Sequence, residues 1–400
     1  MGHAFLIERI DFTMKKLSIF LTCLALTAAM ASCGSSDTSN ADSKSSAPKA
    51  EESAVEETEP ETEEVSEEET EPETEATTKK SKKKKEKTTE AATEAATEAA
   101  TEETSTEAAT EEEEEYDGDD YDTGDPTLDN IRNEDEIGEN EILVVSFGTS
   151  YNDSRRLTIG AIEDSIENAF PDYAVRRGFT SDIIIDHVKK RDKITIDSLD
   201  DALKRASDNK VKNLVIQPTH LMNGFEYEEI EEKIAQYSDA FDKVAIGLPL
   251  LTNDDDFKKV EEAIVDWTSD YNNDETAVVF MGHGTEADSN GVYQKMQDLL
   301  TEDGHKNYFI GTVEATPSLD DVIAKVKEGN YKKVVLEPLM VVAGDHANND
   351  MAGDEDDSWK SAFEREGFEV ECLLRGLGEN DAIRQIYVDH AQEAINAINQ

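Results

Sequence analysis

The segment "SLDDALKRASDNKVKNLVIQP" at residues 198–218 has a second copy further along the chain. The stretch "SLDDVIAKVKEGNYKKVVLEP" at 318–338 aligns with it without a gap, with seven identities in 21 positions. Each copy opens on Ser-x-x-Asp, which is typical of a helix N-terminus, and runs through an amphipathic stretch into a short apolar segment. Each copy therefore predicts one helix followed by one strand.

The sequence around these copies extends the repeat to two whole halves. Short apolar runs alternate with amphipathic stretches, and this alternation is typical of βαβ units with a parallel sheet covered by helices. The predicted strands are 141–148, 173–179, 213–218 and 242–250, then 276–282, 307–313, 333–342 and 368–374. We therefore predict an α/β fold of two similar domains, an N-terminal half at 141–270 and a C-terminal half at 271–400, with a cleft between them.

The part that precedes these halves has a different composition. Residues 34–140 contain 38 Asp and Glu against 10 Lys and Arg, and no aromatic residue before Tyr116. Such a segment buries too little apolar surface to offset the entropy of ordering, so we predict a disordered acidic linker. The lysine run at 79–87 is flanked by acidic residues, and residues 141–400 are also acidic. Both features argue against nucleic-acid binding.

The first 33 residues predict export. From Met14 the chain has two lysines, an apolar run at 17–30 and small residues before Cys33, which is typical of a signal peptide and too short for a reliable membrane span. "ASCG" at 31–34 is similar to a bacterial lipobox, so we expect lipidation at Cys33 and anchoring to the outer face of the cell membrane. Met30 is unusual at its lipobox position, which leaves cleavage without lipidation and a periplasmic protein open. Translation from Met1 or from Met14 is also open.

Three ionisable side chains follow predicted strands of the second half. His283 stands between two glycines, Glu314 follows the next strand, and His346 follows the third. The carboxyl ends of parallel strands meet at one edge of a sheet, where open α/β sheets place their ligands. Two imidazoles and a carboxylate are a common ligand set for divalent transition metals. The sequence therefore predicts a metal site made of these three residues.

Several longer motifs resemble a known family. They are "LVVSFGTSYNDSR" at 143–155, "FMGHG" at 280–284, "VEATP" at 313–317, "LEPLMVVAGDHANNDMAGDEDDSWK" at 336–360 and "GLGEN" at 376–380. Together they resemble the anaerobic class II cobalt chelatases, the sirohydrochlorin cobaltochelatases of vitamin B12 synthesis. The resemblance covers almost all of 141–400 and implies a tetrapyrrole held between two similar α/β domains. The export signal and the tail depart from the family pattern.

The resemblance also implies roles for individual residues. The metal ligands of the family fall here on His283, Glu314 and His346, with His283 or Glu314 as the catalytic proton acceptor. Weaker candidates for tetrapyrrole binding are Ser146, Thr149, His220, Arg155 and Arg156. The last two, with Arg176 and Arg177, are cationic side chains that could pair with carboxylates of the substrate, although ordinary surface arginines fit the sequence equally well.

The expected activity is insertion of Co²⁺ into sirohydrochlorin with release of two protons. Fe²⁺ or Ni²⁺ would use the same residues, because the sequence does not select among these metals. A second alternative is a surface-tethered protein that binds haem, another tetrapyrrole or a metal for uptake without turnover. The chain has no G-x-x-x-x-G-K-[ST] loop, so no nucleotide cofactor is expected.

Overall fold

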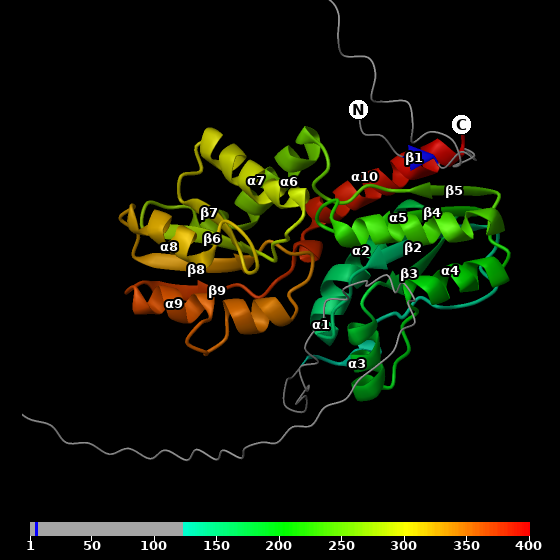
Figure 1. The fold of residues 1–400 in the computed structure, drawn as a ribbon, viewed down its shortest axis with the longest axis horizontal. Helices are drawn as coiled ribbons and strands as arrows, with labels where there is room; N and C mark the ends of the chain where they lie inside the picture. Colours follow the sequence, from blue (N-terminus) through cyan, green and yellow to red (C-terminus); the bar gives the residue numbers. More distant parts are fainter. Residues whose placement is uncertain (1–4, 7–122) are drawn as a thin grey trace, which may run out of the picture. The chain divides into compact units, whose positions relative to one another are not determined.

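The computed structural model describes residues 5–6 and 123–400 (Figure 1). The predicted signal peptide, Cys33 and most of the predicted linker lie outside these residues. Within them, two separate sheets are flanked by helices. No helix in this described part is both long and apolar enough to cross a membrane.

The two sheets repeat each other in topology. The first has the order β1-β5-β4-β2-β3, and only β1 on its edge is antiparallel. The second has the order β7-β6-β8-β9 and is parallel throughout. When β1 is left out and the strands of each half are numbered along the chain, both sheets have the spatial order second, first, third, fourth. The two sheets therefore share one topology, which confirms the duplication. The strands are β1 (Phe5–Leu6), β2 (Asn140–Ser146), β3 (Ala174–Phe179), β4 (Asn213–Pro218), β5 (Lys243–Ile246), β6 (Thr276–Gly282), β7 (Tyr308–Thr312), β8 (Lys333–Pro338) and β9 (Glu369–Cys372).

The helices begin where the repeated segments predict. The hydroxyl of Ser198 accepts a hydrogen bond from the backbone N–H of Asp201 at 3.2 Å, and Ser318 caps its helix in the same way from Asp321 at 3.3 Å. The helices are α1 (Asn152–Arg155), α2 (Ala161–Ala169), α3 (Asp182–Asp192), α4 (Leu199–Asp208), α5 (Phe225–Tyr237), α6 (Asp254–Trp267), α7 (Gly291–Glu302), α8 (Leu319–Lys327), α9 (Trp359–Arg365) and α10 (Asp381–Ile398). There are also two π-helical segments: Arg156–Gly160 joins α1 to α2, and Ala347–Met351 lies between β8 and α9.

The last helix ties the two halves together. One apolar core contains Val144 of β2, Phe280 of β6 and Tyr387 of α10. Helix α10 buries nine side chains and packs against α2, α6, β4 and β5 (Figure 1). The predicted boundary at residue 270 falls between the two sheets. That the segments on either side of it are two domains stays a prediction. The closing helix of the predicted C-terminal half covers the first sheet, so neither half buries its core alone.

The predicted linker needs a correction at its C-terminal end, because residues 123–139 pack against the first half. The side chains of Asp129 and Arg132 are each only 2% exposed and pair with residues of α1, α2 and β3. An acidic composition predicts disorder because apolar surface is scarce. It does not reveal that a single carboxylate has a buried arginine partner. We call residues 123–136 the strap.

Candidate metal centre

The strand order of the second sheet brings the three predicted ligands together. Strand β6 lies between β7 and β8, so the carboxyl ends of these strands are neighbours. His283 directly follows β6, and Glu314 lies two residues after β7. His346 lies at the end of the loop that follows β8. This edge, where the chain leaves neighbouring strands in opposite directions, is the ligand-binding position of open parallel sheets.

The three side chains can converge on one ion. One donor atom from each of His283, Glu314 and His346 lies within 4.8 Å of the others. His283 Nε2 is 3.6 Å from Glu314 Oε1, and the two imidazole rings have centroids 4.6 Å apart at an angle of 69°. Ligands of a tetrahedral ion with bonds of about 2.1 Å lie roughly 3.4 Å apart. The structure therefore brings the three predicted side chains to within reach of one ion. Their role as metal ligands stays a prediction.

The glycine after His283 is required by its surroundings. Gly284 has φ +94°, and a Cβ at this position would lie 2.9 Å from the backbone nitrogen of Ala315. This close approach lets Glu314 N donate to the carbonyl of His283 at 2.9 Å. The Nδ1 of His283 lies 2.9 Å from the Gly284 carbonyl, which assigns the proton to Nδ1 and leaves the Nε2 lone pair for a ligand.

A carboxylate orients the second histidine. Asp350 Oδ2 lies 2.7 Å from His346 Nδ1, four residues away across a π-helical turn. With its proton held on Nδ1, the ring presents Nε2 to the site, as in metal centres with a carboxylate behind the histidine. The hydrogen bond to Asp350 raises the pKa of His346, and partial burial of the ring opposes this. The sequence analysis missed Asp350, although an acid four residues after a histidine is the signal that would have found it.

The comparisons with known proteins identify the family of this chain. Residues 140–396 match the family model described as cobalt chelatase (CbiK). The chain belongs to the cobalt chelatase family. A sirohydrochlorin cobaltochelatase from Salmonella typhimurium is 37% identical over 255 residues, which are 64% of this chain and 96% of that protein. The resemblance drawn from the motifs is therefore confirmed.

Two further proteins are similar to this chain. The sirohydrochlorin cobaltochelatase CbiKC of Nitratidesulfovibrio vulgaris is 31% identical over 261 residues, covering 64% of this chain and 91% of that protein. The solved structure of SirB from Bacillus subtilis with Fe³⁺ is 13% identical, with a TM-score of 0.48, and the match covers 66% of this chain and 98% of that one.

Replacing Asp350 with asparagine is expected to weaken Co²⁺ binding by this cobalt chelatase about 10- to 100-fold, because His346 loses the group that orients it. The pKa of His346 should fall, since an amide no longer favours the imidazolium. Neutral imidazole is the ligand, so Co²⁺ affinity rises with pH through this pKa, and in Asp350→Asn that rise should come at lower pH. Calorimetric Co²⁺ titrations at several pH values measure both effects. The control is Asp354→Asn, an exposed acid paired with Lys360, and equal affinities in the two variants would contradict this role of Asp350.

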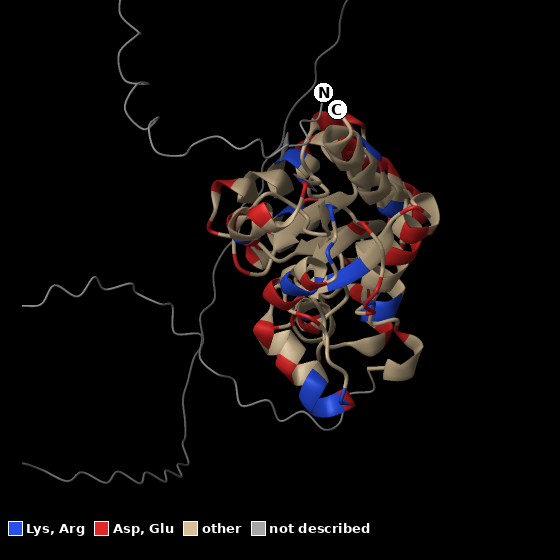
Figure 2. Ribbon diagram, turned by 90° about the vertical axis from the view of Figure 1, so that its right-hand side faces the viewer, with Lys and Arg blue, Asp and Glu red and all other residues tan. Residues whose placement is uncertain are grey.

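Three of the four arginines predicted to meet the substrate are buried inside the first half. Arg155 is fully buried, with its guanidinium bound to Asp129, Asn152 and the carbonyl of Thr149. Arg176 and Arg177 are 3% and 1% exposed. The assignment of these three side chains to the tetrapyrrole is therefore corrected. Arg156 is 34% exposed and paired with Asp153, so its contact with the tetrapyrrole stays a prediction. Figure 2 shows how acidic and basic residues are distributed along the fold.

The other first-half candidates are also largely buried. Ser146 Oγ accepts from the Thr219 hydroxyl at 2.7 Å, and Thr149 Oγ1 accepts from Tyr151 N at 3.2 Å. His220 is 9% exposed, and neither ring nitrogen has a hydrogen-bond partner among the described residues. Burial lowers the pKa of His220 to about 4, so its ring is neutral at physiological pH. Contact of these side chains with a tetrapyrrole stays a prediction. Such contact would require a movement that exposes them.

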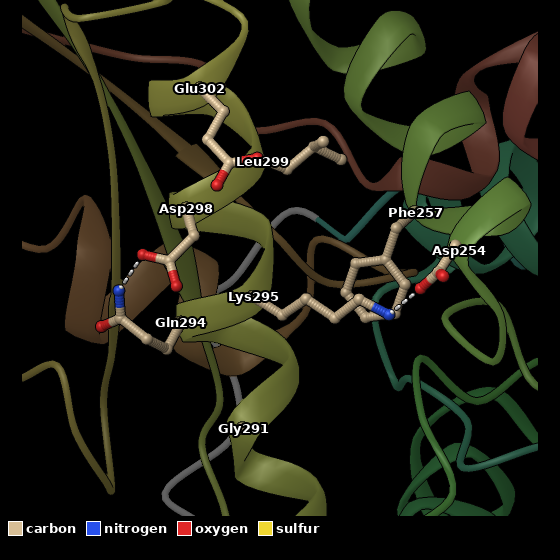
Figure 3. Close-up of a pocket in the computed structure, with 8 residues that line it drawn as sticks. All are labelled: Asp254, Phe257, Gly291, Gln294, Lys295, Asp298, Leu299 and Glu302. Carbon is tan, nitrogen blue, oxygen red and sulfur yellow. Dashed lines mark hydrogen bonds and ion pairs between the residues drawn. The ribbon is translucent and has the colours of Figure 1, made fainter. Parts of the chain in front are cut away.

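A groove elsewhere on the surface has a different character. It lies between α6 and α7, encloses about 560 Å³, and includes none of the three predicted ligands (Figure 3). Lys295 lies 3.9 Å from the centroid of the Phe257 ring and 2.7 Å from Asp254. Because its one lysine is already paired and two further carboxylates, Asp298 and Glu302, also line it, the groove is poorly suited to a polycarboxylate such as sirohydrochlorin.

Proposed function

We propose that this chain inserts Co²⁺ into sirohydrochlorin, with the metal as a substrate held by His283, Glu314 and His346. The observation that carries the proposal is the convergence of these donors within 4.8 Å, at the ligand-binding edge of the second sheet, in a cobalt chelatase family member. Their side chains are 44%, 54% and 35% exposed. Three protein ligands with an open side suit an ion that must leave for the macrocycle.

Metal insertion requires the loss of two pyrrole N–H protons as the metal forms bonds to the four ring nitrogens and leaves its protein ligands. His283 Nε2 and Glu314 Oε1, 3.6 Å apart, form an acceptor pair beside the metal position and are open to water. A proton taken by one of them can pass to the other and then to solvent. Both atoms also face the metal position, so they become available as proton acceptors as the bonds of the metal pass to the ring nitrogens. His346 differs in having Asp350 on its Nδ1, which orients this ring as a ligand. We therefore assign proton transfer to His283 and Glu314.

The direct test uses the full chain with sirohydrochlorin and excess Co²⁺. The absorbance change of the macrocycle should continue through many turnovers, with two protons released into an indicator dye for each metal inserted. A single stoichiometric change without turnover would instead support a binding protein for uptake. Parallel reactions with Fe²⁺ and Ni²⁺ rank the metals. A higher kcat/KM with either one would keep the reaction and replace cobalt as its substrate.

Export and lipid anchoring of the chain are a separate proposal, supported by the lysines, the apolar run and "ASCG" before and around Cys33. Expression in a bacterial host should place the chain in the membrane fraction, and Cys33→Ala should release it from that fraction. Globomycin, which blocks cleavage of lipoprotein signals, should cause a longer precursor to accumulate. A full-length chain in the cytoplasm with and without globomycin would contradict the proposal.

A further inference from the structure

The strap, residues 123–136, lies outside the segment that matches the family, which begins at residue 140. It is nevertheless bound to the first half by buried ion pairs, to which the strap contributes both an acidic and a basic side chain. Asp129 pairs with Arg155 at 2.7 Å and takes both terminal nitrogens of Arg177, at 2.7 and 3.0 Å. Arg132 of the strap lies 3.3 Å from Glu163 of α2. Ion pairs with this burial and geometry fix the positions of their partners.

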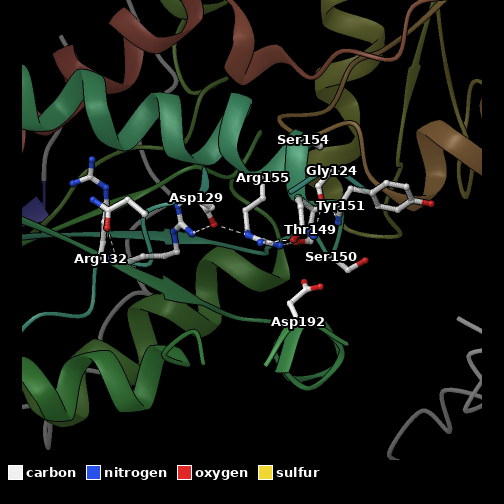
Figure 4. A network of polar contacts seen from close by, with 12 residues as sticks. Gly124, Asp129, Arg132, Thr149, Ser150, Tyr151, Ser154, Arg155 and Asp192 are labelled. Atoms are coloured by element: carbon white, nitrogen blue, oxygen red, sulfur yellow. Dashed lines mark hydrogen bonds and ion pairs between the residues drawn. The ribbon is translucent and has the colours of Figure 1, made fainter. Parts of the chain in front are cut away.

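The network continues from Arg155 into residues 147–154, the connection after β2 together with the start of α1, which we call the β2–α1 loop (Figure 4). One terminal nitrogen of Arg155 donates to the carbonyl of Thr149 at 3.2 Å, and the other donates to Asn152 Oδ1 at 2.6 Å. The strap also contacts this loop directly, since Asp153 N donates to the carbonyl of Thr123 at 2.7 Å. Both ends of the loop are therefore held from the strap side.

The far side of this loop touches the segment that carries His346. Ser154 Oγ accepts a hydrogen bond from the backbone N–H of Ala343 at 2.9 Å. Gly344 lies so close to Thr149 that a Cβ at this position would be 3.1 Å from the threonine hydroxyl. The side chain of Asn348, two residues after His346, donates to the carbonyl of Gly344, two residues before it, at 2.7 Å. This hydrogen bond links the residues on both sides of His346.

We propose that Asp129 is a positioning residue for the metal centre, acting through Arg155 and the β2–α1 loop on the segment 343–346. Its consequence for turnover rests on the proposed function, but its consequence for metal binding does not. When Asp129 is neutralised, Arg177 still has Glu163 as a partner. Arg155 keeps the carbonyl of Thr149, Oδ1 of Asn152 and the electrostatic attraction of Asp192, but it loses the carboxylate to which it is hydrogen-bonded, so the loop loses its fixed anchor.

The test compares Asp129→Asn with Asp125→Asn in the full chain. Asp125 belongs to the same strap, but its side chain is exposed and, among the residues that the structure describes, hydrogen-bonds only to Thr127. We expect Asp129→Asn to weaken Co²⁺ binding roughly tenfold, the lower end of what outer partners of a metal site cost. Its KM for Co²⁺ should rise while the KM for sirohydrochlorin stays constant. Asp125→Asn should bind Co²⁺ like the unmodified chain.

A second variant tests the route without touching the buried charges. Ser154→Ala removes only the acceptor for Ala343 N, so the chain should stay folded even if Asp129→Asn does not. We expect weaker Co²⁺ binding in Ser154→Ala and, where Asp129→Asn folds, a combined effect smaller than the sum of the two. Unchanged Co²⁺ affinity in Ser154→Ala, or in folded Asp129→Asn, would overturn the proposal. A chain that binds Co²⁺ but never metallates sirohydrochlorin would refute the proposed function while leaving this comparison valid.

Discussion

Replacing His283 with alanine is expected to lower the rate of Co²⁺ insertion into sirohydrochlorin by about 10²- to 10⁴-fold, the range for loss of a positioned acid–base group. The substitution removes a proposed metal ligand and half of the proposed acceptor pair with Glu314. Alanine fits the backbone between its two glycines, so the fold should persist. The measurement is the initial rate of the absorbance change with saturating sirohydrochlorin and a range of Co²⁺ concentrations.

The matched control is His305→Ala in the same half. His305 lies outside the site, with its ring 5.6 Å from the Tyr308 ring and Nε2 3.7 Å from Glu261 Oε1. Its loss should leave the insertion rate close to that of the unmodified chain. A His283→Ala chain that metallates sirohydrochlorin at the unmodified rate would remove His283 from the mechanism.

Replacing Arg177 with methionine is expected to lower the free energy of unfolding by about 3–5 kcal/mol, the usual loss when a buried ion pair is left with one partner. Arg177 holds two buried carboxylates at once, with nitrogens 2.7 Å from Asp129 and 2.7 Å from Glu163. Methionine fills much of the space but leaves both acids without their shared partner. Urea unfolding followed by circular dichroism measures the change.

Arg156→Met provides the comparison for Arg177→Met, because it makes the same chemical change at a partly exposed arginine. Arg156 pairs with Asp153 at 3.0 Å on the surface. Exposed pairs contribute roughly 0–1 kcal/mol, so this variant should unfold near the unmodified midpoint. Equal midpoints for the two variants would mean that the buried network does not stabilise the fold.

The fold was predictable because the same pattern of helices and strands occurs twice in the sequence. The apolar runs and the Ser-x-x-Asp caps at Ser198 and Ser318 mark the elements, and the offset of the repeat gives the order of the halves. The return of α10 to the first sheet was not predictable, since periodicity shows that a helix has an apolar face but not which sheet that face covers.

The site was predictable for a related reason. Parallel strands bring their carboxyl ends together, so residues about 30 positions apart, such as His283 and Glu314, can be placed side by side from the strand pattern alone. The burial of Arg155 and Arg177 was not predictable, because their partner Asp129 lies in a segment whose composition indicates disorder. A charged side chain shows its chemistry in the sequence but not whether a distant partner buries it.

The most direct measurement is the position of Co²⁺ in crystals of the full chain soaked with the metal, located by anomalous diffraction at the cobalt edge. We expect one peak about 2.0–2.2 Å from Nε2 of His283, Nε2 of His346 and a carboxylate oxygen of Glu314. A strong peak on other residues, with none between these three at Co²⁺ concentrations that support turnover, would contradict the proposed metal centre.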